Sequence, residues 1–263
     1  AILTKIDDAV WGVPLIVLIM GTGILLTVRL RAVQFRKLGK ALKYMVKNED
    51  DGIGEVSSFG ALCTALAATI GTGNIAGVAT AIAAGGPGAL FWMVVAAFFG
   101  MATKYSEGLL AVKYRTIDED GHVLGGPFYY IENGMGVKFR WLAKIFAFFG
   151  AGVGLFGIGT FTQVNGISSA VRNFFDPDMA HTVALFGNDY SWATVISCLV
   201  LTVCVGMVVL GGIKRIAKVS EIVVPFMAVL YVVLAVIIMV TNITAIPAAI
   251  VTIVKSAFTG SAL

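Results

Sequence analysis

Residues 59–77 read FGALCTALAATIGTGNIAG, an apolar segment that is long enough to cross a membrane but is interrupted by Gly71-Thr72-Gly73-Asn74. Two glycines, a β-branched residue and an asparagine form helix poorly. In hydrocarbon, irregular backbone persists only where it lines a cavity or binds something. The interruption therefore predicts a binding site in a broken helix; the alternative is a glycine-rich packing face on an intact helix.

A broken membrane helix exposes two kinds of backbone group at its centre. The second half presents free N–H groups and a positive dipole end, which suit an anion such as a carboxylate. The first half presents free C=O groups, which suit a cation. A cation-coupled amino-acid transporter needs both kinds of group at one place.

The composition of the whole chain agrees with a membrane protein. Of its 263 residues 58% are hydrophobic and 13% are charged, and the mean hydropathy is +0.92. Soluble domains have roughly 45–50% apolar residues and about 25% charged residues. We predict six membrane-spanning segments, with a seventh apolar segment beginning near Ile246. The six are residues 12–29, 57–84, 88–112, 141–171, 191–211 and 217–241.

The charged residues lie in short stretches between the apolar segments. This pattern does not favour nucleic-acid binding, despite the net charge of +4. Most Lys and Arg residues follow the first, third or fifth segment, which places these connections in the cytoplasm and the N-terminus outside. In the first connection, Leu30–Val46 is either an amphipathic helix on the membrane surface or an ordinary basic loop.

The fourth segment carries two amides, Gln163 and Asn165, deep in an apolar run. An unpaired amide is costly there. Helical spacing puts Gln163 on one stripe with Phe156, with Gly159 or Thr160, and with Gly166 or Ile167. Gln163 could therefore face a pocket; the alternative is a hydrogen bond between packed helices.

No Asp or Glu lies at the middle of a predicted span, and no Cys/His cluster has the spacing of a metal site. The chain is therefore not expected to be an enzyme. Lys104 with Glu107, and Lys218 with Glu221, are predicted to form pairs near the cytoplasmic ends of helices. The absence of a central carboxylate favours sodium held by backbone oxygens over a proton as the coupling ion.

Four motifs together resemble those of the alanine/glycine:cation symporter family. The resemblance covers nearly the whole chain, in order; Val94 departs from it, where the family usually has Trp. The motifs are TIGTGNIAG at 69–77, GGPGALFWM at 85–93, GGPFYYIE at 125–132 and GGIKRI at 211–216.

The resemblance implies an all-α, polytopic protein of leucine-transporter type in a bacterial or archaeal plasma membrane. An extra N-terminal helix and basic connection would occupy residues 1–56. The first five-helix repeat would occupy 57–241, and residues 242–263 would begin a second repeat that is otherwise missing. The activity that the resemblance implies for the protein is sodium-coupled symport of small neutral amino acids, alanine or glycine, by alternating access.

The resemblance also implies roles for individual residues. The amides of Thr72 and Gly73, with Gly71 beside them, would hold the substrate carboxylate. The side chains of Asn74 and Gln163 would contact the substrate. For sodium, the carbonyls of Ala67 and Ile70 are the implied ligands, together with Thr69.

A cation channel is the alternative function. Residues 69–73, Thr-Ile-Gly-Thr-Gly, resemble a potassium-channel filter, in which stacked carbonyls replace the water around the ion. Such filters lie on a re-entrant loop between two spans, whereas here Ile75–Ala84 can complete the crossing.

Overall fold

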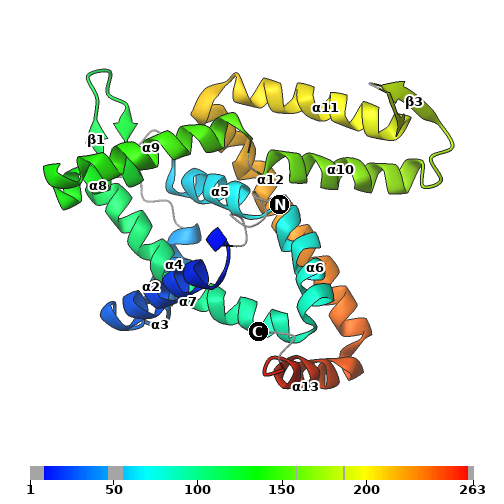
Figure 1. The fold of residues 1–263 in the computed structure, drawn as a ribbon, viewed down its shortest axis with the longest axis horizontal. Helices are drawn as coiled ribbons and strands as arrows, with labels where there is room; N and C mark the ends of the chain where they lie inside the picture. The colour runs from blue at the N-terminus through cyan, green and yellow to red at the C-terminus, as the bar shows by residue number, and fades with distance from the viewer. Residues whose placement is uncertain (1–8, 47–55, 158, 186, 260–263) are drawn as a thin grey trace. The chain divides into compact units, whose positions relative to one another are not determined.

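A computed structural model of the chain describes residues 9–46, 56–157, 159–185 and 187–259 (Figure 1). The chain divides into two compact units. The first unit comprises Ala1–Glu49, Ala79–Phe148 and Asn242–Leu263, and the second comprises Asp50–Val78 and Phe149–Thr241. The predicted position of the N-terminus falls on residues 1–8, outside the described residues.

The first unit is built around a long helix, α7, against which helices from earlier and later parts of the chain pack. Its elements are α2 (Val13–Arg29), α3 (Val33–Arg36), α4 (Leu38–Val46), α7 (Gly88–Lys113), β1 (Thr116–Ile117), β2 (Val123–Leu124), α8 (Pro127–Met135), η2 (Val137–Phe139), η3 (Ile243–Ala245) and α13 (Ile246–Ser256). Within residues 30–46, Val33–Arg36 and Leu38–Val46 are helical, so most of this connection is helix and not an irregular loop. That it lies on the membrane surface stays a prediction.

Close contacts with α7 hold the first unit together. Gly23 of α2 is buried against Phe99, and a Cβ atom added at Gly23 would lie 2.9 Å from the Cβ atom of Phe99. Near the start of α7, the indole Nε1 of Trp92 donates a hydrogen bond of 2.8 Å to the carbonyl oxygen of Ala257, just after α13. Small residues thus let these backbones approach, as in membrane helix bundles.

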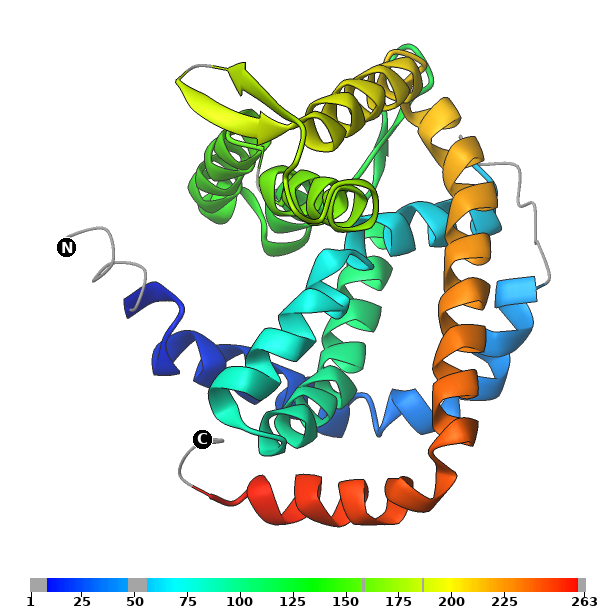
Figure 2. The same ribbon diagram turned by 90° about the vertical axis from the view of Figure 1, so that its right-hand side faces the viewer.

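The second unit contains the interrupted segment and two packed helix pairs (Figure 2). Its elements are α5 (Ser58–Thr69), η1 (Thr72–Asn74), α10 (Thr160–Phe175), β3 (Thr182–Leu185), β4 (Asn188–Ser191), α11 (Trp192–Val209) and α12 (Gly212–Thr241). The boundary between the units falls within α6 (Ala76–Gly85) and α9 (Arg140–Leu155). Helix α5 packs against α12, and α10 packs against α11.

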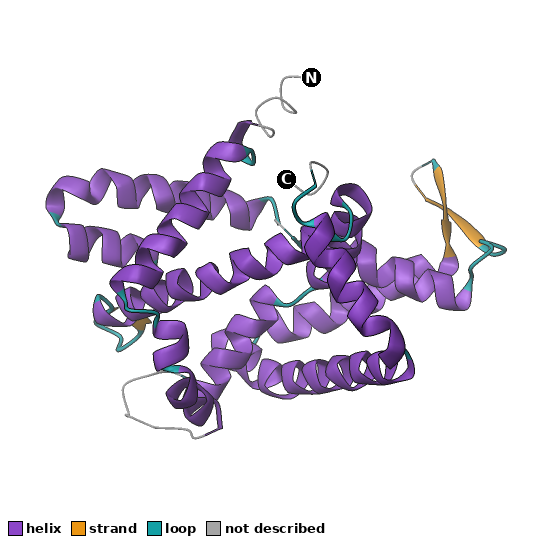
Figure 3. Ribbon diagram, turned by 90° about the horizontal axis from the view of Figure 1, so that it is seen from below, coloured by secondary structure: helices purple, strands orange, loops and turns teal. Residues whose placement is uncertain are grey.

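Two short β-hairpins depart from the purely helical fold that we predicted (Figure 3). Strands β1 and β2 pair antiparallel, as do β3 and β4. Each hairpin has a glycine in the left-handed region near its turn, Gly121 with φ +81° and Gly187 with φ +82°. Both hairpins lie in polar connections, so the structure remains mostly helical.

The predicted fourth span, 141–171, is not one helix. Helix α9 ends at Leu155 and α10 begins at Thr160. Gly157 and Gly159 adopt left-handed backbone, with φ +59° and +80°, which stops α-helix propagation and favours glycine. Phe156 therefore does not share a helical stripe with Gln163, and that part of the prediction is wrong.

Length and composition allow four stretches of the described chain to cross a membrane, or five if α5 and the bent continuation of residues 72–85 count as one span. The four are Gly88–Lys113, Val137–Phe175 including the break between α9 and α10, Trp192–Val209 and Gly212–Thr241. Helix α2, with 17 residues, is a shorter apolar helix. A multi-pass membrane protein is supported, while six spans, the three predicted domains and the leucine-transporter fold stay predictions.

Candidate functional site

The candidate site is the interruption between α5 and α6. Helix α5 ends at Thr69, Ile70 and Gly71 have extended backbone, and a single 3-10 turn at Thr72–Asn74 leads into α6. The helical segments on either side are bent by 65°. No continuous helix passes through Gly71–Gly73; that the two halves form one broken membrane span stays a prediction.

Side chains capture the backbone N–H groups that would otherwise continue α5. Ile70 donates to the carbonyl of Leu66 at 2.7 Å, as in a regular helix. The next two backbone N–H groups bond to side chains and not to helix carbonyls. Gly71 donates to Oδ1 of Asn74, and Thr72 donates to Oε1 of Gln163, both at 2.9 Å. The carbonyls of Ala67 and Ala68, which a continuing helix would use, are thereby freed at the end of α5.

Gln163 reaches the interruption because glycine gives it room. A Cβ atom added at Gly71 would overlap the side-chain amide of Gln163. One turn along α10, Gly166 lies opposite Thr72, and an added Cβ atom would lie 2.7 Å from the Cγ2 atom of Thr72. The two helical positions Gln163 and Gly166 therefore face the same backbone turn, which agrees with that part of the predicted stripe.

The predicted site residues differ in their exposure. Gly71, Thr72, Ile70 and Gln163 are half-buried at the interruption. Gly73 and Asn74 are exposed, and nothing lies within 4 Å of a Cβ atom added at Gly73. This leaves open space beside the Gly73 backbone, where a bound group could approach.

Two of the predicted sodium ligands, Ala67 and Thr69, lie on α5 before the interruption. Ala67 and Thr69 are exposed on the last turn of α5. The hydroxyl of Thr69 donates to the carbonyl of Ala65 at 2.7 Å, so it is engaged within its own helix. Asn165, the second amide of the fourth segment, is exposed on α10, two positions from Gln163.

One contact at the far end of α5 was not predicted. The hydroxyl of Ser57, the N-cap of α5, donates to Oε1 of Glu221 on α12 at 2.8 Å. The predicted pair of Lys218 with Glu221 is thus replaced by a contact to another helix, whereas Lys104 and Glu107 form the predicted ion pair at 3.0 Å. A serine at a helix start signals a cap, but it does not identify a partner 164 residues away.

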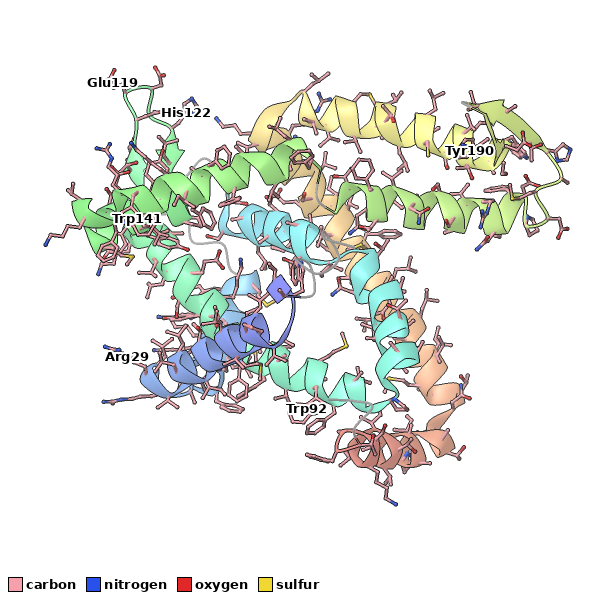
Figure 4. All side chains as sticks on the ribbon, viewed as in Figure 1. Arg29, Trp92, Glu119, His122, Trp141 and Tyr190 are labelled. Atoms are coloured by element: carbon pink, nitrogen blue, oxygen red, sulfur yellow. The ribbon has the colours of Figure 1, made fainter. Side chains whose placement is uncertain are left out.

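Clusters of metal-binding side chains do not occur among the residues that the structure describes. His122, for example, lies with Glu119 on the exposed β1–β2 hairpin (Figure 4). A cation at the interruption would instead meet backbone carbonyls and side-chain oxygens, the hard ligands that suit an alkali metal ion.

The whole chain, residues 1–263, matches the sodium:alanine symporter family. It is 52% identical over 258 residues to an uncharacterized transporter of Haemophilus influenzae, covering 98% of this chain and 53% of that protein. It is 47% identical over 268 residues to the sodium/alanine symporter AgcS of Methanococcus maripaludis, covering 100% of this chain and 55% of that protein.

A third relative is the putative sodium/proton-dependent alanine carrier protein YrbD of Bacillus subtilis. It is 40% identical over 254 residues, which are 97% of this chain and 48% of that protein. The chain therefore spans about half the length of these curated relatives.

Proposed function

This chain belongs to the sodium:alanine symporter family, and from that premise we propose that the full-length protein imports small neutral amino acids, alanine or glycine, together with sodium. The observation that carries the proposal is the interruption after Thr69. There, neighbouring amide and carbonyl groups of the backbone no longer form the hydrogen bonds of an α-helix. An amino-acid carboxylate and a cation need these two kinds of group.

Sodium is proposed to bind at the C-terminal end of α5. The carbonyls there carry the negative end of the helix dipole. Those of Ala67 and Ile70 are the proposed ligands, with Thr69 contributing its hydroxyl after rotating away from Ala65. The remaining ligands would come from the part of the protein beyond this chain.

The substrate carboxylate is proposed to bind at the amides of Thr72 and Gly73, beside Gly71. Gly73 has open space next to its backbone, whereas the Thr72 amide is held by Gln163. Substrate binding would therefore replace the Gln163–Thr72 bond and release the Gln163 amide. That amide and the Asn74 side chain can then bind the substrate, since each both donates and accepts hydrogen bonds.

Alternating access would expose this site to each side of the membrane in turn. From the distribution of Lys and Arg we propose that the connection after α2, the α7–α9 connection and the α11–α12 connection lie in the cytoplasm of a bacterial or archaeal cell. Membership of a symporter family favours coupled transport over a cation channel with a filter at residues 69–73.

Uptake of labelled alanine by the full-length protein in proteoliposomes tests the proposal. A sodium gradient should drive accumulation above equilibrium, and replacing sodium by choline at constant pH should abolish it. Accumulation driven equally well by a proton gradient in choline would reject sodium coupling. Flux of sodium that does not depend on an amino acid would reject symport.

A further inference from the structure

The start of α5 is anchored by a two-step hydrogen-bond relay to α12. The hydroxyl oxygen of Ser57 accepts from the N–H of Gly60 at 2.9 Å, and the same hydroxyl donates to Oε1 of Glu221 at 2.8 Å. A hydroxyl can do both at once. The carboxylate also lies near the positive end of the α5 dipole, where a negative charge is stabilised.

Small side chains bring the two helices close enough for this relay. Gly60 is buried, and a Cβ atom added there would overlap the carboxylate of Glu221. One turn further along α5, Cys63 is only 1% exposed. The buried face of α12 consists of Ala217, Ser220 and Val224, which surround Glu221 at helical spacing.

We propose that Glu221 is a positioning residue for the sodium site. It does not touch the ion; it fixes the start of α5 through Ser57, and α5 is a rigid rod of 12 residues whose other end carries Ala67 and Ile70. A shift at the start of the rod is transmitted to the carbonyls at its end. The role in sodium binding rests on the proposed function, whereas the anchoring of α5 does not.

Cys63 can report on the anchor, because it is buried on α5, one turn after Gly60, and α5 packs against α12. The experiment uses the full-length protein with every other cysteine replaced by serine, and follows the rate at which a small maleimide modifies Cys63. Glu221→Ala and Ser57→Ala should each raise this rate by about ten-fold or more, since a hydrogen bond to a charged group is lost.

Two further variants show whether the hydrogen bond itself matters. Glu221→Gln keeps an acceptor for Ser57, so its labelling rate should stay within about three-fold of the parent, in line with the smaller contribution of a neutral hydrogen bond. Glu107→Gln, which breaks only the surface pair with Lys104, should leave the rate unchanged and serves as the matched control.

Measurements of sodium-dependent uptake then show whether Glu221 positions the sodium ligands or only stabilises the fold. In Glu221→Ala the sodium concentration for half-maximal uptake should rise several-fold, while the KM for alanine at saturating sodium stays near that of the parent; Glu221→Gln should largely restore the sodium dependence. Unchanged Cys63 labelling in both alanine variants would overturn the anchor. Faster labelling with unchanged sodium dependence of uptake would overturn the positioning role. If uptake by the parent protein does not depend on sodium, the proposed function is overturned, while the labelling result still tests the anchor.

Discussion

The side-chain oxygen Oε1 of Gln163 accepts a hydrogen bond of 2.9 Å from the backbone N–H of Thr72. The two residues are 91 positions apart, on α10 and in the turn that interrupts the α5–α6 segment. Gln163 thus occupies a backbone donor that the proposed function assigns to the substrate carboxylate. The amide oxygen of Gln163 accepts from the Thr72 N–H, as a carboxylate oxygen of the proposed substrate would.

Replacing this amide by an apolar side chain of similar size should weaken substrate binding. Gln163→Leu and Asn74→Leu each remove hydrogen bonds at the turn, a loss of roughly 1–3 kcal/mol, or about 5- to 150-fold in alanine affinity. The measurement is the apparent affinity for alanine uptake together with the melting temperature.

The matched control is Asn165→Leu, which makes the same kind of change at an exposed position of α10. Its affinity should stay near that of the parent. If Gln163→Leu and Asn74→Leu lower the melting temperature while leaving the affinity of the surviving protein unchanged, these residues are packing contacts and the site as drawn is wrong.

Gly71→Ala should act on the same contact from the backbone side. The added methyl group would overlap the Gln163 amide, so either the turn or Gln163 must move. We expect alanine affinity to fall by about 5- to 150-fold, since one or two hydrogen bonds of about 1–1.5 kcal/mol each are disturbed. Gly77→Ala, at a position with no atom within 4 Å of the added methyl, should keep its affinity; equal effects of both substitutions would show that general rigidity is being measured.

The local sequence predicted the interruption after α5, because Gly71-Thr72-Gly73-Asn74 is unfavourable in a helix. The hydrogen bond from the Gly71 N–H to the Asn74 side chain, three residues away, was not predicted, since Asn74 was expected to contact the substrate. The second break, after Leu155, was missed because glycines recur from Gly150 to Gly159 and suggest close helix packing equally well. Only the left-handed backbone of Gly157 and Gly159 identifies the break.

Contacts between distant segments could not be derived in the same way. Lys218 lies one turn from Glu221 on the same helix, so spacing predicted that pair. The structure instead pairs Glu221 with Ser57, because Gly60 leaves room for a carboxylate at the start of α5. Gln163 was predicted as a site residue, but its partner, the Thr72 amide, depends on how α10 lies against the turn.

Asp176 should make stability depend on pH at the α10–α11 connection. Its buried carboxylate accepts from the Ser191 hydroxyl at 2.6 Å and from the Ala180 N–H at 2.8 Å. The hydrogen bond from Ser191, followed by those from the backbone of Ala180 and His181, lowers the pKa of Asp176. Its stabilisation is therefore fully present above the ordinary aspartate pKa of about 3.9 and is lost as the pH falls through the lower folded-state value.

The difference in melting temperature between the parent and Asp176→Asn checks this sign. It should be constant from pH 7 down to about pH 5 and shrink below about pH 4. Asp178→Asn, at an exposed position two residues away, should change little at any pH. A difference that grows as the solution becomes more acidic would contradict the assignment.

Trp92 provides the last prediction, for the contact between α7 and the segment after α13 (Figure 4). Its indole N–H donates to the Ala257 carbonyl, and its ring lies against Phe91 and Phe258. Trp92→Phe keeps an aromatic ring but removes the donor, so the free energy of unfolding should fall by about 1–2 kcal/mol, the cost of leaving the carbonyl of a buried residue without its partner. Trp141→Phe, at a side chain that is 59% exposed, makes the same chemical change without breaking this contact and should shift the melting temperature much less. Equal shifts for the two variants would mean that the Trp92 hydrogen bond contributes nothing measurable to stability.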